Sequence, residues 1–179
     1  TEAGLRASRT AQLFFEGCRI PARYRLGEEG EGFKIALATL DHSRLGIAAQ
    51  SVGIHRRALE LAVAYARDRV QFGRPIAEHQ AVSFAIARMA TELAAARVLT
   101  HAAAIREAES DAGRWAAQAK AYASEAANRA CYDALQVHGG NGFSEEYEIA
   151  RLYRDVRVTT IYEGTSEMQR LVIARHLLN

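Results

Sequence analysis

The sequence predicts an all-α protein, an up-and-down four-helix bundle with a fifth, short helix at its carboxyl end. Alanine, the strongest helix former, fills 36 of the 179 positions, whereas proline, the weakest, occurs only at Pro21 and Pro75. From residue 33 onward, apolar residues recur at intervals of three and four, the spacing of one buried helix face. Long helices joined by short loops pack antiparallel, so these observations favour a bundle.

Stop signals separate the predicted helices. The first helix covers about residues 33–69, and Gly73 followed by Pro75 ends it and allows the second to start. The apolar stripe of the second helix runs from Val82 to Leu99, and a turn at about residues 109–113 follows. The third helix has a narrow face of small residues, which lets helix axes approach closely; these are Ala116, Ala119, Ala123, Ala126, Ala130, Ala134 and Val137.

Two shorter helices are expected at the carboxyl end. Residues 138–142, which contain three glycines, end the third helix. The fourth helix is predicted over about residues 145–157 and the fifth over about residues 165–178.

The first thirty residues differ in character. Residues 10–16 are aromatic and partly alternating, which indicates a β-strand, and residues 18–21 suit a second short extended piece because Pro21 disfavours helix before it. A glycine-rich joint covers residues 27–32. One or two strands do not form a stable sheet alone. We therefore expect residues 1–30 to be the end of a β domain and residues 31–179 to be the helical bundle.

Charge and motifs exclude several function classes. The 23 Lys and Arg residues against 21 Asp and Glu residues give a net charge of +2, which argues against nucleic-acid binding. No run approaches the ~20 apolar residues of a membrane span, and the polar start predicts no targeting segment. The histidines lack metal-ligand spacing, and Walker A, HExxH and GxSxG motifs are absent. Cys18 and Cys131 are expected to be buried free thiols.

Three polar clusters at predicted helix ends are candidate sites. In residues 161–170, Glu163 precedes a helix that Thr165 or Ser166 caps, and Ser166 and Gln169 have capping-box spacing. Amide N–H groups at such a helix start can hold an anion or a ligand oxygen. The alternative explanation for Glu163 is a surface carboxylate before a capped helix.

The other two clusters also admit two explanations each. The glycines of residues 136–143 permit close approach of the backbone to a ligand, or they form a helix cap and a tight turn. Residues 67–73 place arginine beside an aromatic ring, which suits phosphate or a flat ring, or they form a solvated charged segment. Asp41 and Arg44 share one helix face, and an intrahelical ion pair explains them without a ligand.

Taken together, the clusters resemble the carboxyl-terminal helical domain of the acyl-CoA dehydrogenases, flavoproteins that desaturate acyl-CoA thioesters. The resemblance covers essentially the whole chain. The stretches that carry it appear in the family's order, at residues 40–50, 69–80, 136–143, 153–155 and 161–170. It implies that residues 1–30 end the family's middle β domain.

The resemblance implies roles for individual residues. Glu163 corresponds to the catalytic base that removes the α proton of the thioester, and Asp41 and Arg44 correspond to positions that meet the acyl-CoA substrate. Some relatives carry the base directly before the arginine equivalent to Arg44, where this chain has Ser43, which cannot serve as a base. The positions that match FAD contacts, several of them made across a subunit interface, are Arg69, Gln71, Phe72, His79, Gln80, Gln136, Gly139, Gly140, Thr165 and Glu167. Some relatives have glutamine in place of Glu167.

The implied activity is FAD-dependent α,β-desaturation of an acyl-CoA to a trans-2-enoyl-CoA, with this chain as the carboxyl-terminal part of the enzyme. The resemblance implies a homodimer or homotetramer, an electron-transferring flavoprotein as acceptor, and a bacterial cytoplasmic or mitochondrial-matrix location. The isolated fragment is expected to be inactive. Two alternatives stay open, namely a flavoprotein acyl-CoA oxidase of the same fold and a helical dimerisation module without catalysis.

Overall fold

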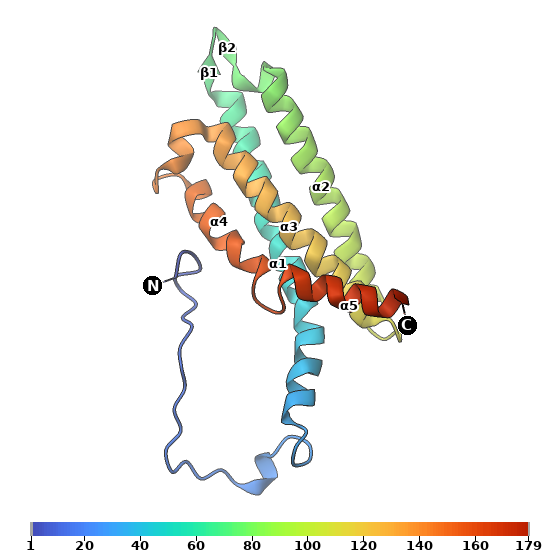
Figure 1. Cartoon of the computed structure of the whole chain (residues 1–179). Coiled ribbons are helices and arrows are strands. Elements are labelled where there is room, and N and C mark those ends of the chain that lie inside the picture. The colour runs from blue at the N-terminus through green and yellow to red at the C-terminus, as the bar shows by residue number, and fades with distance from the viewer. Residues whose placement is uncertain (1, 179) are drawn as a thin grey trace.

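The computed structural model describes residues 2–178, apart from the side chain of Asp41. Three long helices form its body, α1 (Gly32–Asp68), α2 (Gln80–Ile105) and α3 (Ala112–His138). They run up, down and up in Figure 1, and the shorter α4 (Glu148–Val156) runs down again beside α3. The up-and-down arrangement of the bundle is thereby confirmed.

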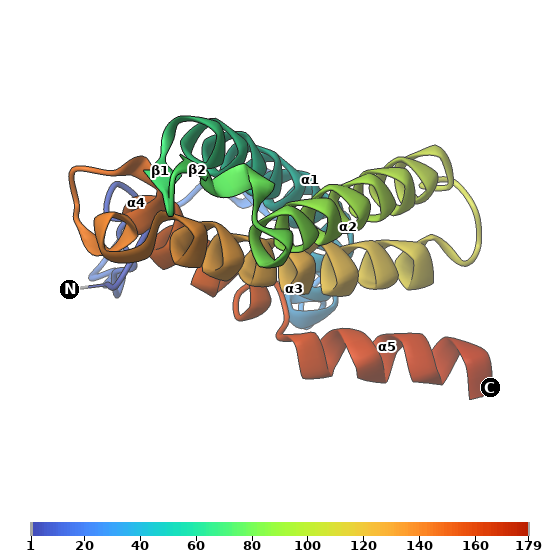
Figure 2. The same cartoon turned by 90° about the horizontal axis from the view of Figure 1, so that it is seen from above.

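The fifth helix, α5 (Ser166–Leu178), packs on α3 rather than extending the bundle. Figure 2 shows it on the side of α3 away from α1 and α2. Short 3-10 turns complete the helical structure, at Ala22–Tyr24, Ile76–Glu78, Gly139–Phe143 and Arg157–Thr160. No helix within residues 2–178 is both long and apolar enough to cross a membrane.

Small side chains fill the core. Every alanine of the predicted stripe on α3 is buried, and alanines of α1, among them Ala48, Ala58 and Ala62, lie in the same core clusters. Because a methyl group is the whole side chain, the axes of α1 and α3 can approach closely. Larger residues from the other helices, Met89 of α2 and Ile149 of α4, close the core at the sides.

The strands lie elsewhere than predicted. Residues 10–16 form no strand in the structure; they belong to an irregular arm that Figure 1 shows beside the bundle. Leu13, Phe14 and Phe15 of this arm are about three-quarters exposed. A strand requires a neighbouring strand to satisfy its backbone groups, and residues 2–178 supply none there. The expectation of a strand at residues 10–16 is therefore wrong for this structure, as is that of a second at residues 18–21.

The two observed strands form a small hairpin between α1 and α2. β1 (Val70–Gln71) pairs antiparallel with β2 (Arg74–Pro75), in the register Val70 to Pro75 and Gln71 to Arg74. The two residues at the turn, Phe72 and Gly73, both have positive φ, 54° and 80°. Two left-handed residues match the twist of a tight hairpin. The sequence predicted only a break between two helices here, not a hairpin.

The two cysteines are free, as predicted, but only one is buried. Cys18 is exposed on the arm. Burial in the α3 core raises the pKa of Cys131 to about 12, which keeps its thiol protonated and inert.

The alanine packing leads to a stability prediction. Ala127→Leu places three extra carbons in the fully buried core, and we expect the free energy of unfolding to fall by about 1–3 kcal/mol. The matched control is Ala90→Leu on the exposed side of α2, which should change it by less than about 0.5 kcal/mol. Urea unfolding followed by circular dichroism measures both. Equal losses in the two variants would show that helix approach does not limit packing.

Candidate functional site

Glu163 lies in a turn with two successive left-handed residues. The φ angle is 54° at Glu163 and 85° at Gly164. A residue with a Cβ occupies this region only when its surroundings hold it there, and such conformations cluster at functional sites. Thr165 follows and caps α5, because its Oγ1 accepts the Met168 N–H at 3.4 Å.

The predicted capping box of Ser166 and Gln169 does not form. The Oγ of Ser166 is buried and finds no partner within the described part of the chain. Gln169 instead turns its amide backward, and its Nε2 donates to the carbonyl oxygens of Glu163 at 3.1 Å and of Gly164 at 2.9 Å. Gln169 therefore stabilises the turn ahead of the helix rather than the helix end itself.

A second donor reaches the same turn from α3. The Nζ of Lys120 donates to the Gly164 carbonyl oxygen at 2.7 Å, and the Lys120 side chain is fully buried. Burial, followed by the nearby charge of Arg44, lowers the pKa of Lys120 to about 8, while Glu163 acts in the opposite direction.

Lys120 is not among the site residues predicted from the sequence, although the sequence holds a signal for it. The chain has two lysines against 21 arginines, and Lys120 lies within the small-residue stripe of α3, directly after Ala119. A lysine at such a position must be buried, and a buried lysine is rarely without a role.

Helix α1 contacts the turn from the remaining side. The hydroxyl of Ser43 donates to Oε2 of Glu163, and the neighbouring Arg44 is buried. About two turns beyond Ser43 along α1, the side chain of Gln50 accepts a hydrogen bond from the Tyr162 hydroxyl at 2.6 Å. The structure thus brings Arg44 and Glu163 close together around the turn, while the side chain of Asp41 lies outside the described residues.

Most of the other predicted positions gather at the far end of α1. Arg69 follows α1, Gln71 and Phe72 lie in the hairpin, and His79 and Gln80 begin α2. The Nε2 of His79 donates to the Gln71 carbonyl oxygen at 3.3 Å, and the His79 ring meets Phe72 edge-on at 5.9 Å. The Phe72 side chain is 93% exposed, so this aromatic ring projects from the molecule.

The end of α3 faces this hairpin across an open depression of about 440 Å³. Of the predicted positions, Arg69, Gln71, Gly139 and Gly140 line it, and Gln136 lies one turn earlier on α3. A Cβ at Gly139 or Gly140 would point into open space. The backbone there leaves room for a ligand, and the guanidinium of Arg69 lines the same depression; a guanidinium fits an anionic group such as the pyrophosphate of FAD.

Contacts between aromatic side chains support the loop that lines this depression. His138 stacks on Tyr65 with 4.3 Å between ring centroids, and its Nδ1 donates to the Ala134 carbonyl oxygen at 2.7 Å. The amide of Asn141 donates to the Tyr65 hydroxyl at 2.9 Å. Burial lowers the pKa of His138, so its ring is neutral at pH 7.

The predicted site residues therefore form two separate groups within one chain. The turn group contains Glu163, Thr165 and Glu167 together with Arg44, and the hairpin group surrounds the depression. Arg44 and Arg69 are 25 residues apart along a continuous helix, which at 1.5 Å per residue separates the groups by about 37 Å.

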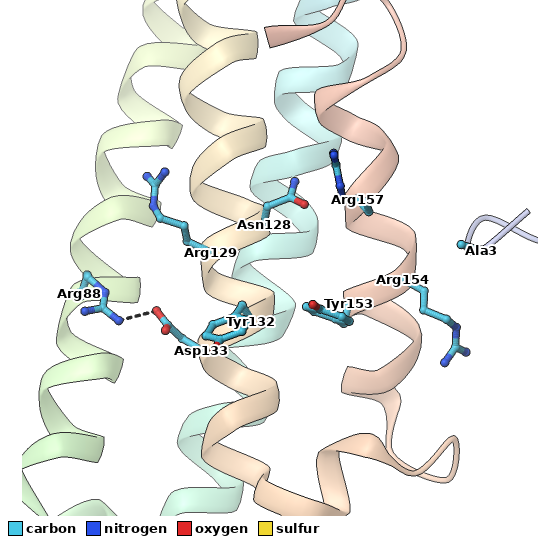
Figure 3. A pocket seen from close by; sticks show the side chains of 9 residues that line it. All are labelled: Ala3, Arg88, Asn128, Arg129, Tyr132, Asp133, Tyr153, Arg154 and Arg157. Carbon is cyan, nitrogen blue, oxygen red and sulfur yellow. Dashed lines mark hydrogen bonds and ion pairs between the residues drawn. The ribbon is translucent and has the colours of Figure 1, made fainter.

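A further cavity belongs to neither group. It measures about 620 Å³ and lies between α2, α3 and α4 (Figure 3). Its arginines are already engaged, since Arg88 pairs with Asp133 at 2.7 Å and Arg129 with Glu92 at 3.3 Å. Tyr153 extends from α4 toward Tyr132 of α3 across the opening. No cluster of His, Cys, Asp or Glu within residues 2–178 is arranged to hold a metal ion.

Known proteins match nearly the whole chain. Residues 30–178 match the family model described as acyl-CoA dehydrogenase, C-terminal domain. The chain is 51% identical over 176 residues to an acyl-CoA dehydrogenase of Bacillus subtilis, a match that covers 98% of the chain and 46% of that protein. The identity to the human mitochondrial short-chain specific acyl-CoA dehydrogenase is also 51% over 176 residues, covering 98% of the chain and 43% of the relative.

A solved structure agrees with these matches. Butyryl-CoA dehydrogenase from Megasphaera elsdenii has a TM-score of 0.96 and 46% sequence identity, over 100% of this chain and 47% of that one. The chain thus spans slightly less than half the length of the relatives it matches.

Replacing glycine by alanine should have opposite effects on stability at Gly164 in the turn and at Gly46 in α1. Gly164→Ala would place its Cβ 2.7 Å from Nε2 of Gln169, at a φ of +85°, and we expect the free energy of unfolding to fall by about 1–3 kcal/mol. Gly46→Ala in α1 meets nothing within 4 Å and should raise it by about 0.5–1 kcal/mol. Chemical denaturation distinguishes the two. Stabilisation by Gly164→Ala would mean that the turn is not held as described.

Proposed function

The chain belongs to the acyl-CoA dehydrogenase family, and from this we propose that it forms the carboxyl-terminal helical part of an FAD-dependent acyl-CoA dehydrogenase. The reaction is the α,β-desaturation of an acyl-CoA thioester to a trans-2-enoyl-CoA. The α carbon loses a proton, the β carbon loses a hydride, and the remaining electron pair becomes the new double bond.

Glu163 is the proposed base. An α proton of a thioester is only weakly acidic, so its removal needs a carboxylate that is already in place. The left-handed turn supports this role because it points the carboxylate of Glu163 at α1, where the Ser43 hydroxyl donates to Oε2. The proton moves from the α carbon to a carboxylate oxygen of Glu163. Arg44 and Asp41, which lie beside Ser43 on α1, are the proposed contacts to the acyl-CoA.

The hairpin group and the start of α5 are the proposed FAD contacts. When bound, FAD supplies the acceptor for the hydride that leaves the β carbon. Arg69 and the backbone at Gly139 and Gly140 suit its pyrophosphate, and Gln71 lines the same depression. The other proposed contacts lie in the hairpin, at the start of α2 and one turn earlier on α3, and are Phe72, His79, Gln80 and Gln136. Thr165 and Glu167 belong to the other group, beside the base.

The separation of the two groups supports an oligomer. About 37 Å along α1 is too far for one FAD to bridge within one chain. We therefore propose a homodimer or homotetramer in which the turn group of one chain and the hairpin group of another hold the same FAD. In such an assembly the site is incomplete in a single chain.

We propose an electron-transferring flavoprotein as the electron acceptor, and a bacterial cytoplasmic or mitochondrial-matrix location. The oxidase alternative differs only in the acceptor, since oxygen would be reduced to hydrogen peroxide. A peroxide trap during turnover separates the two. The alternative of a non-catalytic dimerisation module is less well supported, because a fully buried lysine beside Glu163 has no evident use in a purely structural domain.

The base assignment is tested with Glu163→Gln in the full-length enzyme. Glutamine keeps the shape of the side chain but cannot accept the proton, so exchange of the substrate α proton with solvent should fall by roughly 10²–10⁴-fold. The control is Glu146→Gln on an exposed loop, which should leave exchange unchanged. Exchange that persists in Glu163→Gln would place the base elsewhere.

The cofactor assignment is tested with Arg69→Gln in the same enzyme. Loss of a charge-assisted hydrogen bond of about 1.5–3 kcal/mol should weaken FAD binding by roughly 10–100-fold. The ratio of flavin to protein absorbance measures this, and Arg97→Gln on the exposed side of α2 is the control. A parent enzyme that is colourless and does not take up added FAD would refute the cofactor itself.

A further inference from the structure

We propose that Lys120 is a positioning residue for proton abstraction. Together with Gln169 it holds the carbonyl oxygens at the Glu163–Gly164 turn, and its ammonium group supplies a buried positive charge beside the carboxylate of Glu163. This inference rests on the proposed role of Glu163 as the base.

The location of Lys120 is costly for folding. Its side chain is fully buried on a face of α3 that otherwise carries alanines, among them Ala116, Ala119 and Ala123. Removing an ammonium group from water disfavours the charged form, and the pKa of about 8 indicates that the surroundings do not fully compensate for burial. Lysines are almost never fully buried without such compensation.

The hydrogen bond that Lys120 makes does not by itself explain this cost. The Gly164 carbonyl oxygen already accepts Nε2 of Gln169 at 2.9 Å, in addition to Nζ of Lys120 at 2.7 Å. A neutral residue at position 120 would therefore leave that carbonyl hydrogen-bonded. Natural proteins retain destabilising groups where function needs them. We therefore attribute the lysine to its effects on the conformation of the turn and on the carboxylate of Glu163.

The geometry indicates two effects on Glu163. First, the turn contains a left-handed residue with a Cβ, which costs about 1–3 kcal/mol and persists only while its surroundings hold it. Lys120 from α3 and Gln169 from α5 hold the backbone, and Ser43 from α1 holds the carboxylate. A base displaced by about 1 Å can lose a hundredfold in rate.

The second effect is electrostatic. Four charged residues act on Lys120, namely Arg44 on α1, Glu163 in the turn, Glu125 on α3 and Glu167 on α5. Attraction to the three carboxylates favours the ammonium form, whereas Arg44 opposes it. In return, the ammonium group attracts the carboxylate of Glu163 toward the turn that carries it.

The compact shape of the lysine head group suits this place. An ammonium group is a point charge on a flexible four-carbon stem, whereas a guanidinium is a wide planar fork. The chain uses arginine 21 times and lysine only at Lys34 and Lys120. Lys34 is exposed on α1, with 83% of its side chain accessible, and is a matched control.

The test uses Lys120→Met, Lys120→Gln and the control Lys34→Met in the full-length enzyme. We expect kcat of Lys120→Met to fall by up to about a hundredfold, with KM for the acyl-CoA changed less than kcat. Lys120→Gln retains a donor without the charge, so it should recover part of kcat.

Thermal stability separates this role from a merely structural one, because the two predict opposite changes in the melting temperature of Lys120→Met. The pKa of Lys120 is lowered from 10.5 to about 8 in the folded state, so below pH 8 the folded protein carries the full cost of the buried charge. Between pH 8 and 10.5 the unfolded state binds more protons, and that cost disappears as the pH rises. Lys120→Met should therefore melt at the same or a higher temperature than the parent at pH 7, and the difference should narrow toward pH 10.

Each outcome decides between the proposals. Unchanged kcat in Lys120→Met, with Glu163→Gln inactive, would overturn the inference about Lys120 and leave the base in place. A lower melting temperature of Lys120→Met at pH 7 would assign Lys120 a structural role only, and Lys120→Gln would then melt near the parent. Persistent α-proton exchange in Glu163→Gln would overturn the proposed function, and the role of Lys120 with it.

Discussion

The close approach of α1 and α3 is the constraint on which the rest of the structure depends. Alanines of both helices meet in the core, including Ala48 against the cluster of Ala119 and Ala123. Because these contacts are made by methyl groups, side chains on either helix can reach one common point. Ser43 of α1 and Lys120 of α3 both contact the turn that carries Glu163. Larger core residues would separate the helices, and the turn would lose the contact from one of them.

The interactions at this turn differ in kind from the many ion pairs on the surface. Pairs such as Arg57 with Glu148 at 2.6 Å lie on exposed side chains and contribute at most about 1 kcal/mol each. The core supplies stability through packing, and surface charge adds little to it. The buried charge of Lys120 works against stability, which is why its presence argues for function more strongly than any of the exposed arginines.

The fold was predictable from sequence where the signal is local. The spacing of the alanines on α3 predicts which positions of the helix are buried, and the glycines and prolines predict the helix ends to within a few residues. The strand expected at residues 10–16 failed because strand pairing needs a distant partner, which local composition does not reveal. In the site, Glu163 and Arg44 came from the family resemblance. The contacts of Lys120 and Gln169 could not be predicted, because only the packing of α3 and α5 brings these side chains to the carbonyl oxygens of residues 163 and 164.

The contact between Ser43 and Glu163 gives a physical reason for the two base positions implied by the resemblance. Positions 43 and 163 are 120 residues apart in sequence, yet their side chains share a hydrogen bond. A carboxylate at either position would therefore lie in the same part of the site. The two positions differ in what supports them, because position 43 lies on a regular helix and position 163 on a left-handed turn. A base on the helix is positioned by the helix itself, whereas a base on the turn needs the donors of Lys120 and Gln169 to hold its backbone.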